Sequence, residues 1–190
     1  LGQPTSAVIP AIMALGESLG APGRDLLAAY VAGFEVTAKI ARSIPEKGRG
    51  KWHSAGTLGT FGATVSCAKL LRLDADQLRM ALGIAAAMAS GIVCNYGTMS
   101  KPLDTGLAAR NGVTAAKLAQ AGFTASPQGL ESEAGFFGAY LTLPPDLSPF
   151  AELGQCNDLL HGIKIKPYPC GGLAHNAIDA VLDMRFSHGI

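Results

Sequence analysis

Two lysines that are each followed by a proline are the residues of this chain best suited to chemistry. Lys101 lies in the run TMSKPL (98–103), and Lys166 lies in the run IKPYPC (165–170). Because proline disfavours helical backbone in the residue before it, both lysines are predicted to lie at non-helical corners. Charged residues make up only 15% of the chain, so two cations held at corners indicate a site for an anionic ligand. The alternative is that both are ordinary solvated lysines, since lysine side chains are mostly exposed.

His53 is the first candidate for acid–base chemistry. It stands directly before a helix predicted to begin in the run SAGT (54–57), and a helix N-terminus offers free N–H groups and a partial positive charge to an anion. A neutral imidazole beside a bound carboxylate can transfer a proton at about pH 7. The alternative is a structural histidine in a loop.

Polar side chains accompany both lysines. The uncharged loop before Lys101 carries side chains that could hydrogen-bond a substrate or simply cap the loop, namely Asn95, Tyr96 and Thr98. Tyr168 forms a second polar pair with Lys166. A lysine beside an apolar wall can hold a carboxylate or protonate a carbanion. These residues favour chemistry on a small carboxylate.

The composition excludes several other classes of function. The net charge is +1 and no basic block appears, which argues against a nucleic-acid partner. The four cysteines lie far apart and show no metal-ligand spacing, so we expect no metal site and reduced thiols in a cytoplasmic, reducing compartment. The chain also has no glycine-rich phosphate loop, dinucleotide-binding fingerprint or serine nucleophile elbow.

Two segments bear on targeting and membrane insertion. Residues 80–100 carry no charge and are long enough to span a bilayer, but their alanine, glycine and polar residues favour a buried helix followed by a loop. Residues 1–4 show neither the charged nor the apolar region of a signal peptide. The start without methionine indicates a piece of a longer polypeptide.

Helices must position these residues, because apolar side chains recur with helical spacing along most of the chain. Asp74 and Gln77 resemble a capping box, and Asp104 is expected to cap a helix that begins at Thr105. Dense glycine and alanine within the helices predict close helix–helix packing. The predicted helices cover residues 5–19, 24–43, 54–71, 75–90, 105–120, 131–141, 148–153 and 176–186.

The end of the chain differs from the rest. Residues 161–166 alternate between isoleucine and lysine, which predicts a short strand. We therefore expect a mainly α fold, in which residues 1–160 are part of a helical domain and residues 161–190 begin a smaller mixed domain.

Four runs, in order along nearly the whole chain, resemble the MmgE/PrpD family. They are KWHSAGTLG (51–59), GTMSKPL (97–103), AARNG (108–112) and KPYPC (166–170). The family includes 2-methylcitrate dehydratase, cis-aconitate decarboxylase and iminodisuccinate epimerase. The resemblance implies an all-helical domain with a smaller α+β lid domain, an active site in the cleft between them, a homodimer, and no metal or organic cofactor.

By this resemblance, His53, Lys101 and Lys166 match the family's active-site histidine and two lysines. Two positions depart from the family, because Gln3 and Asp104 stand where many members carry histidine. An aspartate at position 104 changes both the charge of the site and the groups that can exchange a proton there. The identity of the substrate is therefore left open. The residues expected to line the substrate are Gln3, Asn95, Tyr96, Thr98, Asp104 and Tyr168.

The resemblance implies a cofactor-independent lyase of the dehydratase or decarboxylase type. Its substrate would be a small di- or tricarboxylate, held by the lysines, from which His53 helps to remove a proton next to a carboxylate. Two alternatives remain open. One is an epimerase of a dicarboxylate, and the other is an inactive fragment or paralogue that only binds a partner or dimerises.

Overall fold

The chain is almost wholly helical. The computed structural model describes residues 3–189, and across that range no strand or sheet forms beyond two isolated bridges, Arg49 with Leu141 and Trp52 with Ile92. The predicted mainly α fold is therefore confirmed. The chain divides into two compact units, Leu1–Leu160 and His161–Ile190.

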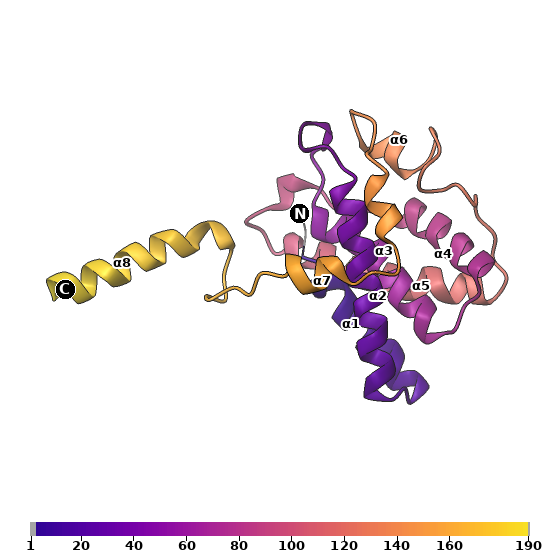
Figure 1. Ribbon diagram of the computed structural model, residues 1–190, viewed down its shortest axis with the longest axis horizontal. Coiled ribbons are helices and arrows are strands. Elements are labelled where there is room, and N and C mark those ends of the chain that lie inside the picture. The colour runs from indigo at the N-terminus through magenta and orange to yellow at the C-terminus, as the bar shows by residue number, and fades with distance from the viewer. Residues whose placement is uncertain (1–2, 190) are drawn as a thin grey trace. The chain divides into compact units, whose positions relative to one another are not determined.

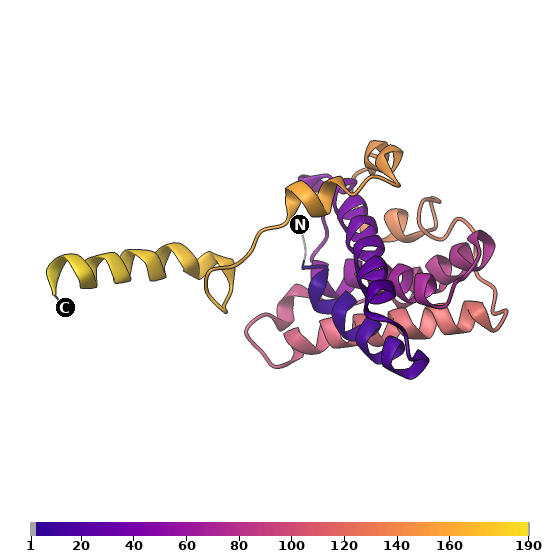
Figure 2. The same ribbon diagram turned by 60° about the horizontal axis from the view of Figure 1, so that its bottom comes forward.

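The first unit is a bundle of long helices centred on α3. The long helices are α1 (Thr5–Leu19), α2 (Gly23–Arg42), α3 (Ser54–Leu70), α4 (Ala75–Met88) and α5 (Ser100–Gln120). Short helices lie in the connections: η1 (Glu46–Gly48), η2 (Val93–Asn95), α6 (Phe136–Tyr140), η3 (Ser148–Glu152) and α7 (Asn157–Gly162). Helix α3 packs against α1, α2, α4 and α5, as Figures 1 and 2 show from two directions.

Helix α3 can lie at the centre because its residues are small. Every residue from Ser54 to Ala68 is buried. Four of its buried hydroxyl groups donate to backbone carbonyls, those of Thr57, Thr60, Thr64 and Ser66, as in the bond that Ser66 donates to Ala29 at 2.8 Å. A buried hydroxyl without such a partner would cost free energy. The polar composition of α3 is therefore compatible with complete burial.

The close packing predicted from glycine and alanine is confirmed. A Cβ atom added to Gly33 on α2 would lie 2.4 Å from the carbonyl oxygen of Gly62 on α3. A Cβ atom added to Gly112 on α5 would lie 2.4 Å from the Cβ atom of Ala63 on α3. Any larger residue at these positions would push the helices apart.

Replacing Gly112 by alanine should lower the free energy of unfolding by about 1–3 kcal/mol, because the new methyl group overlaps Ala63. Gly106→Ala, on the same helix, is the matched control. Nothing lies within 4 Å of a Cβ atom at Gly106, so the helix propensity of alanine should stabilise that variant by roughly 0.5–1 kcal/mol. Urea denaturation of both variants measures the difference, and equal free energies of unfolding would contradict the close approach of α3 and α5.

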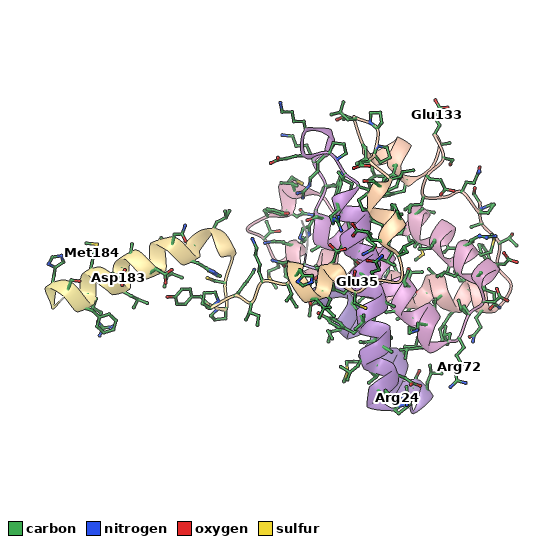
Figure 3. The ribbon with its side chains drawn as sticks, in the orientation of Figure 1. Arg24, Glu35, Arg72, Glu133, Asp183 and Met184 are labelled. Carbon is green, nitrogen blue, oxygen red and sulfur yellow. The ribbon has the colours of Figure 1, made fainter. Side chains whose placement is uncertain are left out.

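A buried ion cluster ties α7 to α2. The ammonium group of Lys39, which is fully buried, donates to Glu35 at 2.9 Å and to Asp158 at 2.8 Å. The Glu35 carboxylate also accepts the N–H group of Leu159 at 2.7 Å, and Figure 3 shows Glu35 where α2 meets α7. Burial by itself would lower the pKa of Lys39 and raise that of Asp158. Their hydrogen bond and opposite charges outweigh burial, so the pKa of Lys39 is raised and the pKa of Asp158 is lowered.

Helix α5 begins at Ser100, whereas the predicted start was Thr105. The prediction that Lys101 lies outside a helix is therefore wrong. Pro102 is tolerated because it lies in the first turn, where N–H groups have no partner within the helix. Asp104 consequently lies inside α5 and does not cap it, which corrects the second expectation for this segment.

Two further predictions need correction. The helix expected over residues 131–141 is confined to α6, because residues 127–134 form turns. The strand expected over residues 161–166 is wrong, since residues 161 and 162 complete α7 and residues 163–166 pair with no strand in the described part of the chain. An alternating sequence forms a strand only where a neighbouring strand takes its hydrogen bonds. In the second unit, η4 (Gly172–Ala174) leads into α8 (His175–His188), which confirms the last predicted helix.

Candidate functional site

His53 is held in place by the segment that follows α4. Its N–H group donates to the carbonyl of Gly91 at 3.1 Å, and the N–H group of Val93 donates to the carbonyl of Lys51 at 3.1 Å. These bonds place His53 directly before the first turn of α3, with its side chain only 6% exposed. The histidine is thus part of the rigid bundle and not of a free loop.

Asp104 pairs with His53 across the bundle. Its Oδ2 atom lies 3.0 Å from Nδ1 of His53, and both side chains are buried. The contact between His53 and Asp104 joins the N-terminal end of α3 to the beginning of α5. Because Lys101 and Asp104 are three residues apart in α5, they lie on the same side of that helix.

Tyr96 connects His53 to Lys101. The Tyr96 and His53 rings meet edge to face, with their centroids 5.1 Å apart and their planes at 81°. The Lys101 ammonium group lies 4.7 Å from the centre of the Tyr96 ring, where an aromatic face attracts a cation. We call these four residues, His53, Tyr96, Lys101 and Asp104, the His53 cluster. The structure thus brings the predicted histidine and one of the two predicted lysines to one aromatic side chain.

Two glycines allow the backbone to approach the His53 cluster closely, a role that the sequence alone does not reveal. Gly91 has a φ angle of 111°, and a Cβ atom there would lie 3.3 Å from Oδ2 of Asp104 and from Cβ of His53. A Cβ atom on Gly56 would lie 3.1 Å from Cβ of Asp104. The only sign of this role in the sequence is that Gly56 follows His53 closely and Gly91 precedes the loop that contains Tyr96. The sequence shows neither the φ angle of Gly91 nor the proximity of both glycines to Asp104.

Thr98 and Asn95 build the loop that carries Tyr96. The Thr98 hydroxyl donates to the Asn95 carbonyl at 2.8 Å and accepts the N–H group of Ser100 at 3.2 Å. This arrangement matches the loop-capping alternative for Thr98. Contacts of Asn95 and Thr98 with a substrate stay predictions.

Gln3 is exposed and lies just before α1. Its backbone carbonyl accepts the N–H group of Ser6 at 3.1 Å and the Ser6 hydroxyl at 2.7 Å. Helix α1 packs on α3, where a Cβ atom on Gly59 would lie 2.7 Å from Ala7. A contact between Gln3 and a substrate stays a prediction.

Lys166 and Tyr168 belong to the second unit, in a segment that is not helical, as predicted for Lys166. The Lys166 ammonium donates to the carbonyl of Cys170 at 3.3 Å. The Tyr168 hydroxyl donates to Asp179 at 2.5 Å, and this hydrogen bond to a carboxylate raises the pKa of Tyr168. Because the two units are separate bodies, a site shared by Lys166 and His53 stays a prediction.

Comparison with known proteins identifies the family. Residues 2–147 match the MmgE/PrpD N-terminal domain. The chain belongs to the MmgE/PrpD family. It is similar to cis-aconitate decarboxylases from Homo sapiens (33% identical over 195 residues), Aspergillus terreus (31% over 194) and Mus musculus (30% over 193). These alignments cover 96%, 95% and 96% of the chain but 39%, 40% and 39% of the relatives, so the chain spans about two fifths of their length.

Membership of the MmgE/PrpD family confirms the resemblance drawn from the runs around His53 and Lys101. The matched range includes all four residues of the His53 cluster and ends before Lys166. Residues 80–100 divide between α4 and the loop that contains η2, as expected. No helix of residues 3–189 combines the length and the apolar character needed to cross a membrane.

Proposed function

We propose that the complete protein is a lyase of the dehydratase or decarboxylase type that acts on a small di- or tricarboxylate. The observation that carries the proposal is the convergence of His53 and Lys101 on the ring of Tyr96 in a member of the MmgE/PrpD family. The similarity to cis-aconitate decarboxylases supports the same class of reaction.

His53 is the proposed acid–base group. In a dehydration, the C–H bond next to a carboxylate breaks, the proton goes to the imidazole, and the electron pair moves into the carboxylate. The pair then returns to form a C=C bond while the C–O bond of the neighbouring carbon breaks, and the leaving hydroxyl group takes a proton from the imidazolium and departs as water. In a decarboxylation, the bond from carbon to a carboxylate breaks, carbon dioxide leaves, and the carbanion takes a proton from His53 or Lys101.

The electrostatics of the His53 cluster suit an anion. The contact between His53 and Asp104 lies near the N-terminal ends of α3 and α5, and helix N-termini carry a partial positive charge. Lys101 adds a full charge there. A lysine in a first turn opposes the helix dipole, so stability alone disfavours it at this position. The ring of Tyr96 offsets part of this cost, and a bound carboxylate would offset more of it.

Lys166 and Tyr168 complete the proposal as substrate contacts from the second unit. Lys166 is exposed and would hold a second carboxylate, as the family resemblance implies. We also propose polar contacts between the substrate and Gln3, Asn95 and Thr98. The complete protein is further proposed to form a homodimer and to need no metal or organic cofactor.

Replacing Lys101 by alanine should lower the turnover of the complete protein by about 10²–10³-fold, because one preorganised charge would be lost from the transition state. Lys117→Ala, in the last turn of the same helix, is the matched control and should keep wild-type turnover. A panel of di- and tricarboxylates followed by NMR in D₂O supplies the assay. Unchanged turnover of Lys101→Ala would remove this lysine from the mechanism.

The same NMR assay separates the alternative functions. Loss of water or carbon dioxide from a carboxylate supports the lyase. Deuterium uptake without either loss would indicate the epimerase. Binding of carboxylates by the complete protein with neither uptake nor turnover would support the inactive binding protein and overturn the proposed function.

A further inference from the structure

We infer that Asp104 is a positioning residue that holds the hydrogen of His53 on Nδ1 and leaves Nε2 to exchange the proton with the substrate. The inference rests on the proposed function for its catalytic consequence, but the tautomer itself can be measured independently. It replaces the earlier expectation that Asp104 contacts the substrate.

The geometry of the pair supports this role. Oδ2 of Asp104 lies 3.0 Å from Nδ1 of His53, and the two residues are 8% and 4% exposed. An ionised carboxylate can only accept hydrogen bonds, so Nδ1 must carry the hydrogen that this bond requires. The nitrogen with the free lone pair is then Nε2.

The backbone restrains both partners. The N–H group of His53 donates to Gly91, and its carbonyl accepts the N–H group of Thr57 at 2.9 Å. Asp104 lies within the regular part of α5, where Gly56 and Gly91 approach it closely. Because neither backbone can shift without disturbing α3 or α5, the ring of His53 is held by its backbone and by Nδ1.

Nε2 of His53 is the ring nitrogen left without a protein partner. Among the residues that the structure describes, the only buried side-chain nitrogen or oxygen without a hydrogen-bond partner is Nε2 of His175. Nε2 of His53 forms no hydrogen bond in the same range and is not among these fully buried atoms, so it keeps some contact with solvent although the side chain is only 6% exposed. Nε2 is therefore the ring nitrogen that remains for a substrate in the proposal.

The charge of Asp104 argues against direct substrate binding. A carboxylate that touched a carboxylate substrate would repel it, and like charges in one site disfavour each other. Beside His53, the same charge is useful, because it stabilises the imidazolium that forms when Nε2 takes a proton.

Nitrogen NMR of the complete protein labelled with ¹⁵N-histidine tests the tautomer. At a pH where the ring of His53 is neutral, the wild type should show the hydrogen on Nδ1, whereas imidazole in water favours hydrogen on Nε2. In Asp104→Asn the amide can also donate to Nδ1, so the population with hydrogen on Nδ1 should fall. Asp76→Asn, an exposed aspartate on α4, is the control and should leave the tautomer unchanged.

Kinetics of Asp104→Asn supply the second readout. If Asp104 positions the base, kcat should fall by roughly 10²-fold or more while KM changes by less than about threefold. A rise in KM with an unchanged kcat would instead make Asp104 a substrate contact and overturn the inference.

The two readouts keep the inference separate from the proposed function. Wild-type His53 with its hydrogen on Nε2 would overturn the inference even if Asp104→Asn failed to fold. Absence of turnover with every carboxylate tested would overturn the proposed function, while the NMR spectrum would still decide whether Asp104 sets the tautomer.

Discussion

Replacing His53 by glutamine should lower the turnover of the complete protein roughly 10³- to 10⁴-fold, which is the largest effect that we expect on activity. Glutamine can fill the space beside Tyr96 and hydrogen-bond Asp104, but its amide cannot take a proton from carbon. Because Lys101 is untouched, KM should change by less than about threefold. The loss should therefore fall on kcat.

The measurement combines initial rates with deuterium exchange at the carbon next to the substrate carboxylate. Exchange should be lost together with turnover, since both need the same proton transfer. His188→Gln, an exposed histidine at the end of α8, is the control, and thermal unfolding verifies that the buried substitution leaves the bundle intact. Retention of more than roughly a tenth of the wild-type turnover would show that another group takes the proton.

Replacing Lys39 by methionine should lower the free energy of unfolding by about 3–5 kcal/mol, the largest effect that we expect on stability. Lys39 is fully buried, and its removal would leave the Glu35 carboxylate without a cation and would leave Asp158 with only the partly exposed Arg42. Hydrogen exchange of the amides of residues 152–160 should also become faster, because this cluster ties them to α2. Chemical denaturation and hydrogen exchange measure the two effects.

The stabilisation by this cluster should depend on pH. The pKa of Asp158 is lowered, so its contribution is complete above about pH 4 and is lost as the pH falls through the lowered value. The pKa of Lys39 is raised, so its contribution is complete below about pH 10 and is lost as the pH rises through the raised value. The difference in stability between wild type and Lys39→Met should be greatest between these limits and should shrink in acid.

Two comparisons isolate the buried charge. Arg42 contacts the same Asp158 at 3.3 Å, but its side chain is 44% exposed, so Arg42→Met should have a much smaller effect than Lys39→Met. In a Glu35→Gln and Asp158→Asn background, Lys39→Met should also cost much less, because no carboxylate is left unpaired. Equal losses in both backgrounds would show that packing, and not charge, makes Lys39 important.

Features that depend on a few adjacent residues could be predicted from the sequence. The capping box of α4 is present, with hydrogen bonds of 2.8 and 3.1 Å between Asp74 and Gln77. Helices α1 and α5 end where glycine follows, and Gly20 and Gly122 adopt φ angles of 60° and 86°. Each of these signals is local, because the residues that form the bond or the turn are the residues that carry the pattern.

The wrong predictions involve neighbours that are distant in sequence. The alternation at residues 161–166 was interpreted as a strand, but no neighbouring strand is present in residues 3–189 to pair with it. Pro102 was expected to exclude a helix around Lys101, but the first turn of α5 accommodates it because its missing N–H group needs no partner there. The contact between Lys39 and Asp158 was missed, because the two residues are 119 positions apart in the sequence.

The sequence by itself determined the helical class, the family, and the choice of His53 and Lys101 as candidates for chemistry. Only the tertiary structure decided that Tyr96 lies between them and that Asp104, 51 residues from His53, binds its Nδ1 atom. The physical reason is that these contacts depend on how closely α3 and α5 approach each other. That approach is set by glycines and alanines whose neighbours across the bundle are not evident from any local pattern.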